Sequence, residues 1–294
     1  MMSPTRRRES GSALVVVLWS LALLAAVLVA VGATARTEAR IARNAIDHAR
    51  AGHACTAGIH RGIVWLLDPE RRATLAADGR PHAQAFEEFR LGIAITDEGG
   101  KVDLNAAAGG LIAAAFVAAG LPSEHALRLA DAAIDWRDAD ELRRPGGAES
   151  ADYRRAGLDH GPRNAPFETV EEIRQLLGMD DEVFRRAAPW LTAHSGAPGV
   201  DPWTAPPTLL RALPGLDPAE IEVFLRLRAA APPNGEQAAP LNDVNGVFSP
   251  SLGLGYTIAV SAEADGGARV QCAALIWLTG RNDEPYAVLS WRGP

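Results

Sequence analysis

The order of hydrophobic and polar residues is most distinctive near the start of the chain. Residues Ser12–Thr34 contain no charged side chain over 23 positions. As an α-helix this segment would be about 34 Å long, enough to cross a hydrocarbon core of about 30 Å. Three arginines at positions 6–8 precede it, and basic residues favour the cytoplasmic side. The pattern predicts one membrane-spanning helix, with the rest of the chain on the opposite side of the membrane.

The helical period continues beyond the apolar segment. Eight residues recur in steps of three and four on one helix face: Ile41, Ala45, His48, Gly52, Cys55, Ile59, Ile63 and Leu66. Residues Ala33–Ala35 could instead end a cleaved signal peptide, but the apolar stretch exceeds the usual length of about 7–15 residues. The continuous period favours a single long helix that stays in the mature protein.

A different period, with every second residue apolar, marks the predicted strands. It covers Phe89–Thr96 and recurs, between turn residues, in Tyr256–Ala262, Ala268–Leu278 and Pro285–Trp291. The last three segments predict an antiparallel meander. The early strand can join their sheet only if the residues in between form an insertion. The predicted fold class is therefore α+β, with a long N-terminal helix, an antiparallel sheet and a large all-α inserted domain.

The predicted insertion, roughly residues 102–248, contains signals for short helices. Thr169 and Glu172 form a capping box, and Asp217 precedes Pro218 at a second helix start. Similar leucine-rich turns accompany both sites, which gives a weak internal duplication of two helical hairpins. Helix-hairpin-helix units often bind DNA, but here acidic residues occupy positions where phosphate needs positive charge. This pattern and the net charge of −7 argue against nucleic-acid binding.

Cysteine content and catalytic motifs narrow the function further. Cys55 and Cys272 can form a disulfide in an oxidising compartment or can be two buried small side chains, and the sequence leaves both alternatives open. The chain contains no C-x-x-C, G-x-S-x-G, H-E-x-x-H or Walker glycine loop. We therefore expect a structural protein and not an enzyme.

The densest group of ionisable side chains lies between Asp131 and Asp159. The first acids of this group share one face near the end of a helix predicted over Ala126–Trp136, where negative charge opposes the helix dipole. Calcium, which prefers about 6–8 oxygen ligands, could neutralise such a loop. Alternatively, the loop is solvated and paired with nearby arginines. The candidate calcium ligands are Asp135, Asp138, Asp140, Glu149 and Asp152.

The N-terminal features together resemble a type IV prepilin-like protein. A basic leader ends in Gly11, an apolar helix begins at Ser12, and an amphipathic continuation follows. The resemblance implies cleavage by a prepilin peptidase after Gly11 and methylation of Ser12, although serine replaces the usual aromatic residue or methionine. Most such proteins carry glutamate at the fifth mature position, where this chain has Val16. That absence is typical of the K-type minor pseudopilins of the type II secretion pathway.

Two internal motifs also resemble the K-type family. They are DLNAA at Asp103–Ala107 and the pattern DWxDxD…RPGGAExxxY at Asp135–Tyr153. The resemblance implies a pseudopilin sheet packed on the N-terminal helix, an insert of sterile-alpha-motif-like or helix-hairpin-helix-like units, and calcium bound in that insert. The expected segments are a leader (1–11), a transmembrane helix (12–35), a periplasmic half-helix with the first strand (36–100), the insert (101–250) and a C-terminal β-meander (251–294).

The resemblance also implies a location and a role. The chain would be anchored in the bacterial inner membrane by one helix, with its bulk in the periplasm, and would cap the pseudopilus tip during export of folded proteins across the outer membrane. Its expected partners are the I-type and J-type minor pseudopilins, the major pseudopilin, the prepilin peptidase and the inner-membrane assembly platform. The alternative is a secreted or membrane-anchored periplasmic protein, calcium-binding or hydrolytic, with a cleaved signal peptide.

Overall fold

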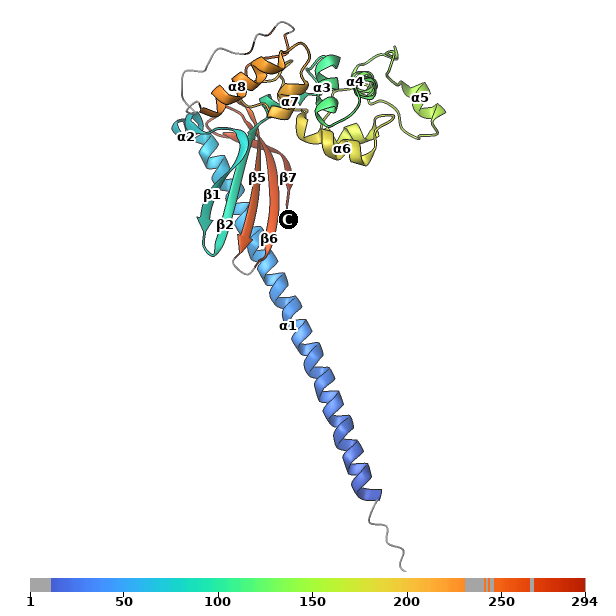
Figure 1. The fold of residues 1–294 in the computed structure, drawn as a ribbon, viewed down its shortest axis with the longest axis vertical. Helices are drawn as coiled ribbons and strands as arrows, with labels where there is room; N and C mark the ends of the chain where they lie inside the picture. The colour runs from blue at the N-terminus through green and yellow to red at the C-terminus, as the bar shows by residue number, and fades with distance from the viewer. Residues whose placement is uncertain (1–11, 231–240, 242, 244–245, 265–266, 294) are drawn as a thin grey trace, which may run out of the picture.

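The longest element of the protein is helix α1, Ser12–Leu67, which projects far beyond the other elements (Figure 1). The computed structural model describes residues 12–230, 241, 243, 246–264 and 267–293. The most apolar 18-residue window of α1 has a mean hydropathy of 3.0, and none of it is buried. Its length and composition therefore allow α1 to cross a membrane, as the sequence predicts. The expected cleavage residue Gly11 lies outside the described residues.

A five-stranded antiparallel sheet packs against the C-terminal end of α1. Its strands lie in the order β1 (Asp78–Phe86), β2 (Phe89–Asp97), β5 (Gly255–Ala264), β6 (Arg269–Leu278) and β7 (Tyr286–Arg292). Strand β1 was not predicted, because Gly79 and Pro81 disfavour a strand and the segment lacks an apolar alternation. Since β1 is an edge strand, its proline is tolerated there.

Glycine residues allow α1 to approach the sheet closely. A Cβ atom at Gly58 would lie 2.6 Å from a methyl group of Val260, and one at Gly62 would lie 2.8 Å from Ile258. Both partners are on β5, whose apolar residues alternate toward the helix. The predicted packing of the N-terminal helix on an antiparallel sheet is confirmed.

A disulfide also holds α1 on the sheet, because it joins Cys55 of α1 to Cys272 of β6 with a Cα–Cα distance of 6.2 Å.

The face of α1 that continues from this contact toward the N-terminus is only partly covered. Toward the N-terminus of the same predicted stripe, Ile41, Ala45 and His48 are exposed, and Ile41 keeps 63% of its accessible surface. The sheet therefore accounts for one end of the stripe and leaves the other end uncovered.

Residues 98–254 form an insertion at one end of the sheet (Figure 1), because β2 and β5 are paired neighbours with Asp97 opposite Tyr256. Outside the insertion, a short helix, α2 (Pro69–Thr74), lies between α1 and β1. The elements of the insertion, hereafter the insert, are η1 (Glu98–Gly100), β3 (Val102–Asp103), α3 (Gly109–Ala118), α4 (Ser123–Arg137), α5 (Ser150–Arg155), η2 (Val170–Gln175), α6 (Asp181–Ala187), η3 (Ala188–Trp190), β4 (Leu191–Thr192), α7 (Pro207–Ala212) and α8 (Pro218–Ala230).

The insert corrects the all-α description made from sequence. Strands β3 and β4 form a two-stranded parallel sheet, which is too short to show a period-2 pattern. The capping box of Thr169 and Glu172 is present, but it starts the 3₁₀ helix η2 and not an α-helix. At the start of α8, Asp217 accepts a hydrogen bond of 2.8 Å from the backbone N–H of Ala219, as its sequence position predicts.

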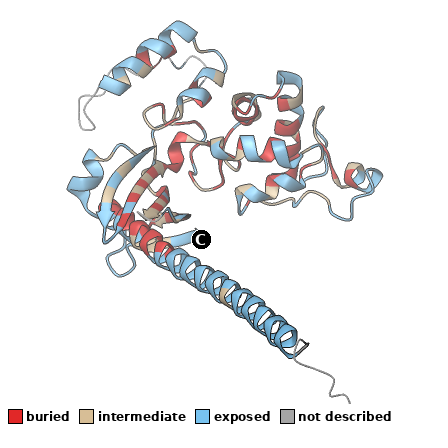
Figure 2. Ribbon diagram, turned by 60° about the horizontal axis from the view of Figure 1, so that its bottom comes forward, coloured by how far each residue is buried: buried red, intermediate tan, exposed pale blue. Residues whose placement is uncertain are grey.

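Buried side chains form two separate hydrophobic cores (Figure 2). One lies between α1 and the sheet, and we call this part the helix–sheet body. The other lies inside the insert and contains large buried side chains such as Phe116 and Tyr153. The insert therefore has a core of its own and is joined to the helix–sheet body at the ends of β2 and β5.

Candidate functional site: the acidic loop

The predicted acidic stretch forms the connection between α4 and α5, and we call residues 138–149 the acidic loop. Helix α4 ends at Arg137, with Asp138 as its C-cap, and Glu149 is the N-cap of α5. Both ends are anchored in the insert core, because the buried rings of Trp136 and Tyr153 lie next to each other with centroids 6.2 Å apart. The acidic loop is therefore fixed to the insert core at both ends.

Three carboxylates of the acidic loop converge. Asp138, Asp140 and Glu149 each offer one oxygen, and these three oxygens lie within 4.8 Å of one another. Carboxylate oxygens are the ligands that calcium prefers, at distances of about 2.3–2.6 Å. One cation at the centre of this group could contact all three side chains.

Two members of this group have buried oxygens with no hydrogen-bond donor among the described residues. They are Oδ1 of Asp138 and both carboxylate oxygens of Glu149, which is only 3% exposed and whose side chain faces the backbone N–H of Asp152 in a capping box without forming a hydrogen bond to it. Burial, followed by the charge of Asp135, raises the pKa of Glu149 to about 7. Burial and the neighbouring Asp140 also raise the pKa of Asp138. A buried carboxylate without donors is unfavourable, so a proton, a cation or a bound water would stabilise this group.

The other two candidate ligands contact different partners. Asp135 is fully buried, accepts a hydrogen bond of 3.1 Å from the backbone N–H of Arg144, and lies 3.6 Å from its guanidinium group. Asp152 accepts a hydrogen bond of 3.1 Å from the backbone N–H of Glu149 and forms an ion pair of 2.6 Å with Arg155. The arginine pairing expected of a solvated loop is therefore present, but it involves Asp135 and Asp152. The structure brings together three of the five candidates, with the other two positioning the loop.

Two glycines let the acidic loop fold back onto α4. A Cβ atom at Gly147 would lie 2.0 Å from Oδ2 of Asp135, and one at Gly146 would lie 3.0 Å from the Cα atom of Arg128. Any side chain at Gly147 would displace the buried carboxylate. The glycines of the RPGG motif thus have a steric role that the sequence analysis did not assign.

A second group of buried acids lies where the insert joins the sheet, and we call it the neck: Asp97, Glu98 and Asp103. Asp103 accepts five hydrogen bonds of 2.7–3.1 Å. Two come from the backbone N–H groups of residues 105 and 106, and three come from residues 195 and 196, which follow β4. Asp103 therefore ties the entry of the insert to a segment more than 90 residues later.

The carboxylates of Glu98 and Asp97 also have hydrogen-bond or ion-pair partners within the protein. Lys101 lies 2.5 Å from Glu98, and the hydroxyl of Thr257 donates a hydrogen bond of 2.7 Å to it. Burial would raise the pKa of Glu98, but Lys101 and the hydrogen bonds outweigh it and lower the pKa. Asp97 accepts hydrogen bonds from the hydroxyl of Ser251 at 2.7 Å and from the N–H of Gly99 at 2.8 Å. The sequence does not distinguish Asp97 and Glu98 as functional residues, because two acids followed by two glycines are typical of a turn.

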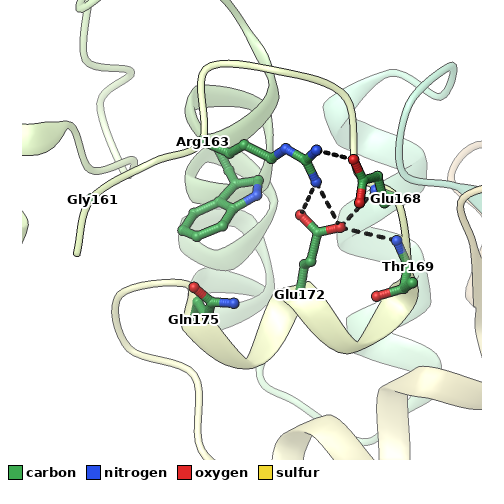
Figure 3. A pocket seen from close by; sticks show the side chains of 7 residues that line it. Gly161, Arg163, Glu168, Thr169, Glu172 and Gln175 are labelled. Atoms are coloured by element: carbon green, nitrogen blue, oxygen red, sulfur yellow. Dashed lines mark hydrogen bonds and ion pairs between the residues drawn. The ribbon is translucent and has the colours of Figure 1, made fainter.

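A hollow of about 510 Å³ lies next to η2, and Figure 3 shows the side chains that line it. Arg163 points between Glu168 and Glu172, and its Nη1 atom lies 3.1 Å from both oxygens of Glu172. Glu172 also accepts a hydrogen bond of 3.0 Å from the backbone N–H of Thr169. These contacts neutralise the arginine and attach the preceding loop to the first turn of η2, which is a structural role.

Two comparisons with known proteins relate to these features. Residues 93–196, which include the acidic loop and most of the neck contacts, match the family model "Type II secretion system (T2SS), protein K". The structure is similar to a chain of the crystal structure of the GspK-GspI-GspJ complex from the enterotoxigenic Escherichia coli type 2 secretion system. The two chains are 17% identical, with a TM-score of 0.53 over 84% of this chain and 99% of that chain. No curated protein sequence matches the chain.

A long apolar helix packed on an antiparallel sheet, with a further segment inserted between two neighbouring strands, is the fold that the resemblance to the K-type minor pseudopilins implies. At 17% identity the structural likeness shows this fold, and the family match adds a specific assignment for residues 93–196. Together they confirm the resemblance to the K-type minor pseudopilins of the type II secretion system.

Proposed function

We propose that the chain caps the tip of a type II secretion pseudopilus and thereby supports export of folded proteins across the outer membrane. In this proposal α1 anchors the chain in the inner membrane with the bulk in the periplasm, and a prepilin peptidase cleaves between Gly11 and Ser12. The protein acts as a structural subunit, and its new N-terminus is methylated.

The observation that carries the tip position is the combination of Val16 with the insert. In shaft subunits a glutamate at the fifth mature position is thought to neutralise the N-terminal amine of the next subunit, and an unpaired buried charge is unfavourable. Val16 cannot supply that charge. The insert lies at the end of the molecule opposite the N-terminal end of α1 (Figure 1), where a further subunit stacked above would collide with it.

The exposed stripe of α1 supports an assembly with other pseudopilins. Ile41 and Ala45 lie beyond the sheet and are exposed, so another helix could cover them. The similar solved structure is by its title a complex of three Gsp proteins, which makes the I-type and J-type minor pseudopilins the expected partners. The major pseudopilin and the inner-membrane assembly platform are further expected partners, because a tip subunit would belong to the filament that they form and assemble.

We also propose that the acidic loop binds calcium. Asp138, Asp140 and Glu149 would be the side-chain ligands, because their oxygens converge and some of these are buried without donors. Backbone carbonyls and water would complete a coordination number of about 6–8. Asp135 and Asp152 would hold the loop in the binding conformation.

The processing step gives the decisive test. Gly11→Val should block cleavage, because a branched side chain replaces the bare backbone that the peptidase accepts. We expect precursor to accumulate in the inner membrane and secretion to fall, as measured by mass spectrometry of the mature N-terminus and by secreted activity. A mature protein that begins at Arg36 would instead show a cleaved signal peptide and would refute the pseudopilin assignment.

The tip position has a separate test. Val16→Glu places a carboxylate in the membrane helix, where a central charge costs about 2.5–3.5 kcal/mol and less near the interface. At the tip no amine would pair with it, so assembly and secretion should be unchanged or reduced. A clear gain in either would show that the subunit occupies an internal position.

A further inference from the structure

A groove of about 470 Å³ separates the insert from one face of the sheet. Its floor is formed by Thr257, Leu275 and Ser290, which are register partners on β5, β6 and β7. The alternate residues Ile258 and Ile276 belong to the core shared with α1. The groove therefore lies on the sheet face that α1 does not cover, directly beneath the insert.

The opposite wall of the groove comes from η2 and α6 and is basic. The guanidinium carbon of Arg174 lies 3.9 Å from the ring centroid of Phe184, and its Nη1 atom is 2.6 Å from Asp181. Arg185 donates a hydrogen bond of 3.3 Å to the backbone carbonyl of the same Asp181. Arg174 therefore pairs with the Asp181 carboxylate, whereas Arg185 contacts only the backbone carbonyl of that residue, and both arginines line the groove.

The charges around the groove do not cancel. Lys101 and Glu98 form a buried pair, with side chains 14% and 3% exposed, and neutralise each other. At the edge, Arg292 lies 3.9 Å from Glu171, and both side chains are more than half exposed. The lining therefore contains four cations and two acids, and it stays positive even when Asp181 is added, although the chain carries a net charge of −7.

We propose that this groove is a docking site for a short acidic segment of a partner protein. Three strands spaced by about 4.8 Å give a floor about 10 Å wide, which fits about three extended residues. Carboxylates of the segment would bind Arg174 and Arg185, because guanidinium groups form paired hydrogen bonds with carboxylates. Apolar side chains of the segment would contact Leu275 and Leu289. This proposal depends on the groove and not on the position of the subunit in a filament.

The test uses the full-length chain in detergent micelles and a fluorescein-labelled, N-acetylated, C-amidated hexapeptide of alternating glutamate and leucine. Fluorescence anisotropy should show saturable binding that weakens with added salt, because the contact is electrostatic. The same peptide with glutamine in place of glutamate should bind at least about tenfold more weakly, a difference of about 1.4 kcal/mol. Equal binding of the two peptides would overturn the proposal.

Variants then locate the site. Arg185→Glu should weaken the glutamate peptide at least about tenfold, and Ser290→Trp should do the same by filling the floor without a change of charge. Arg226→Glu, on the exposed surface of α8, is the matched control and should bind as the unchanged protein does. Thermal melts establish that each variant is folded. Unchanged binding in both groove variants would place the peptide elsewhere, and displacement of the peptide by equimolar inorganic phosphate would show a general anion site; either result refutes the proposal.

Discussion

Buried acidic side chains occur at the neck and in the acidic loop, and their surroundings differ in kind. At the neck, Asp103 accepts five hydrogen bonds and Glu98 is paired with Lys101. In the acidic loop, both oxygens of Glu149 are buried without a donor among the described residues. The acids of the neck are paired with protein groups, whereas the loop leaves carboxylate oxygens available to a proton, water or the proposed cation. Burial of a carboxylate therefore does not by itself identify a ligand site, and the donors around each oxygen must also be compared.

The largest effect should come from the neck. Asp103→Ala leaves the buried N–H and hydroxyl groups of Ser195, and three part-buried N–H groups, without this acceptor, and each buried donor left unpaired costs about 1–3 kcal/mol. We expect a loss of about 3–5 kcal/mol in the free energy of unfolding, measured by urea denaturation of the full chain in detergent. Asp159→Ala, at an exposed position, is the control and should change it by less than about 0.5 kcal/mol. A loss below about 1 kcal/mol for Asp103→Ala would mean that the neck is not a structural joint.

The next effect concerns calcium at the acidic loop. At a concentration a hundredfold above Kd, calcium should stabilise the protein by about 2.7 kcal/mol. Magnesium should do much less, because it requires a tight octahedron and retains its water. Asp138→Asn combined with Asp140→Asn should remove the calcium response, while Asp159→Asn should keep it. Thermal melts of the full chain in chelator, calcium and magnesium measure this effect. Three superimposable curves would refute calcium binding by the acidic loop.

A pair of glutamine substitutions should give effects of opposite sign. In chelator at pH 8, Glu149→Gln should stabilise the protein by about 1–3 kcal/mol, because it removes a carboxylate whose pKa burial has raised to about 7. Glu98→Gln should destabilise it by a similar amount, because Lys101 then loses its buried partner. Urea denaturation measures both. Two changes of the same sign would contradict the distinction between the loop and the neck.

The smallest effect should be the pH dependence contributed by Asp97. Burial raises its pKa above the usual value of 3.8, although hydrogen bonds from Ser251 and Gly99 partly offset this. The native state therefore holds the proton more tightly, so this contribution to stability falls as pH increases from about 3.8 through the folded-state pKa. Asp97→Asn should remove that fall and gain up to about 1 kcal/mol relative to the unchanged protein between pH 4 and 7.5. Urea midpoints at the two pH values test this, and a relative loss at pH 7.5 would contradict it.

The sequence by itself determined the elements whose signals are local. The uninterrupted apolar run and the three–four period predicted α1, and simple alternation predicted β2, β5, β6 and β7 to within a few residues. The N-cap at Asp217 and the capping box at Thr169 were also visible, because a cap depends only on residues within one helical turn. The acidic stretch was recognisable as a candidate metal site because its carboxylates are concentrated in one segment of the sequence.

Tertiary structure decided everything that depends on residues far apart in the sequence. Strand β1 forms because β2 offers it a paired edge, despite its weak intrinsic preference. Only the packing of α1 on β6 brings Cys55 and Cys272 together. Only the fold of the acidic loop over α4 separates Asp138, Asp140 and Glu149 from Asp135 and Asp152. The sequence cannot distinguish the roles of these carboxylates, because they carry the same charge. Each role depends on the hydrogen-bond donors that the folded chain places around that carboxylate.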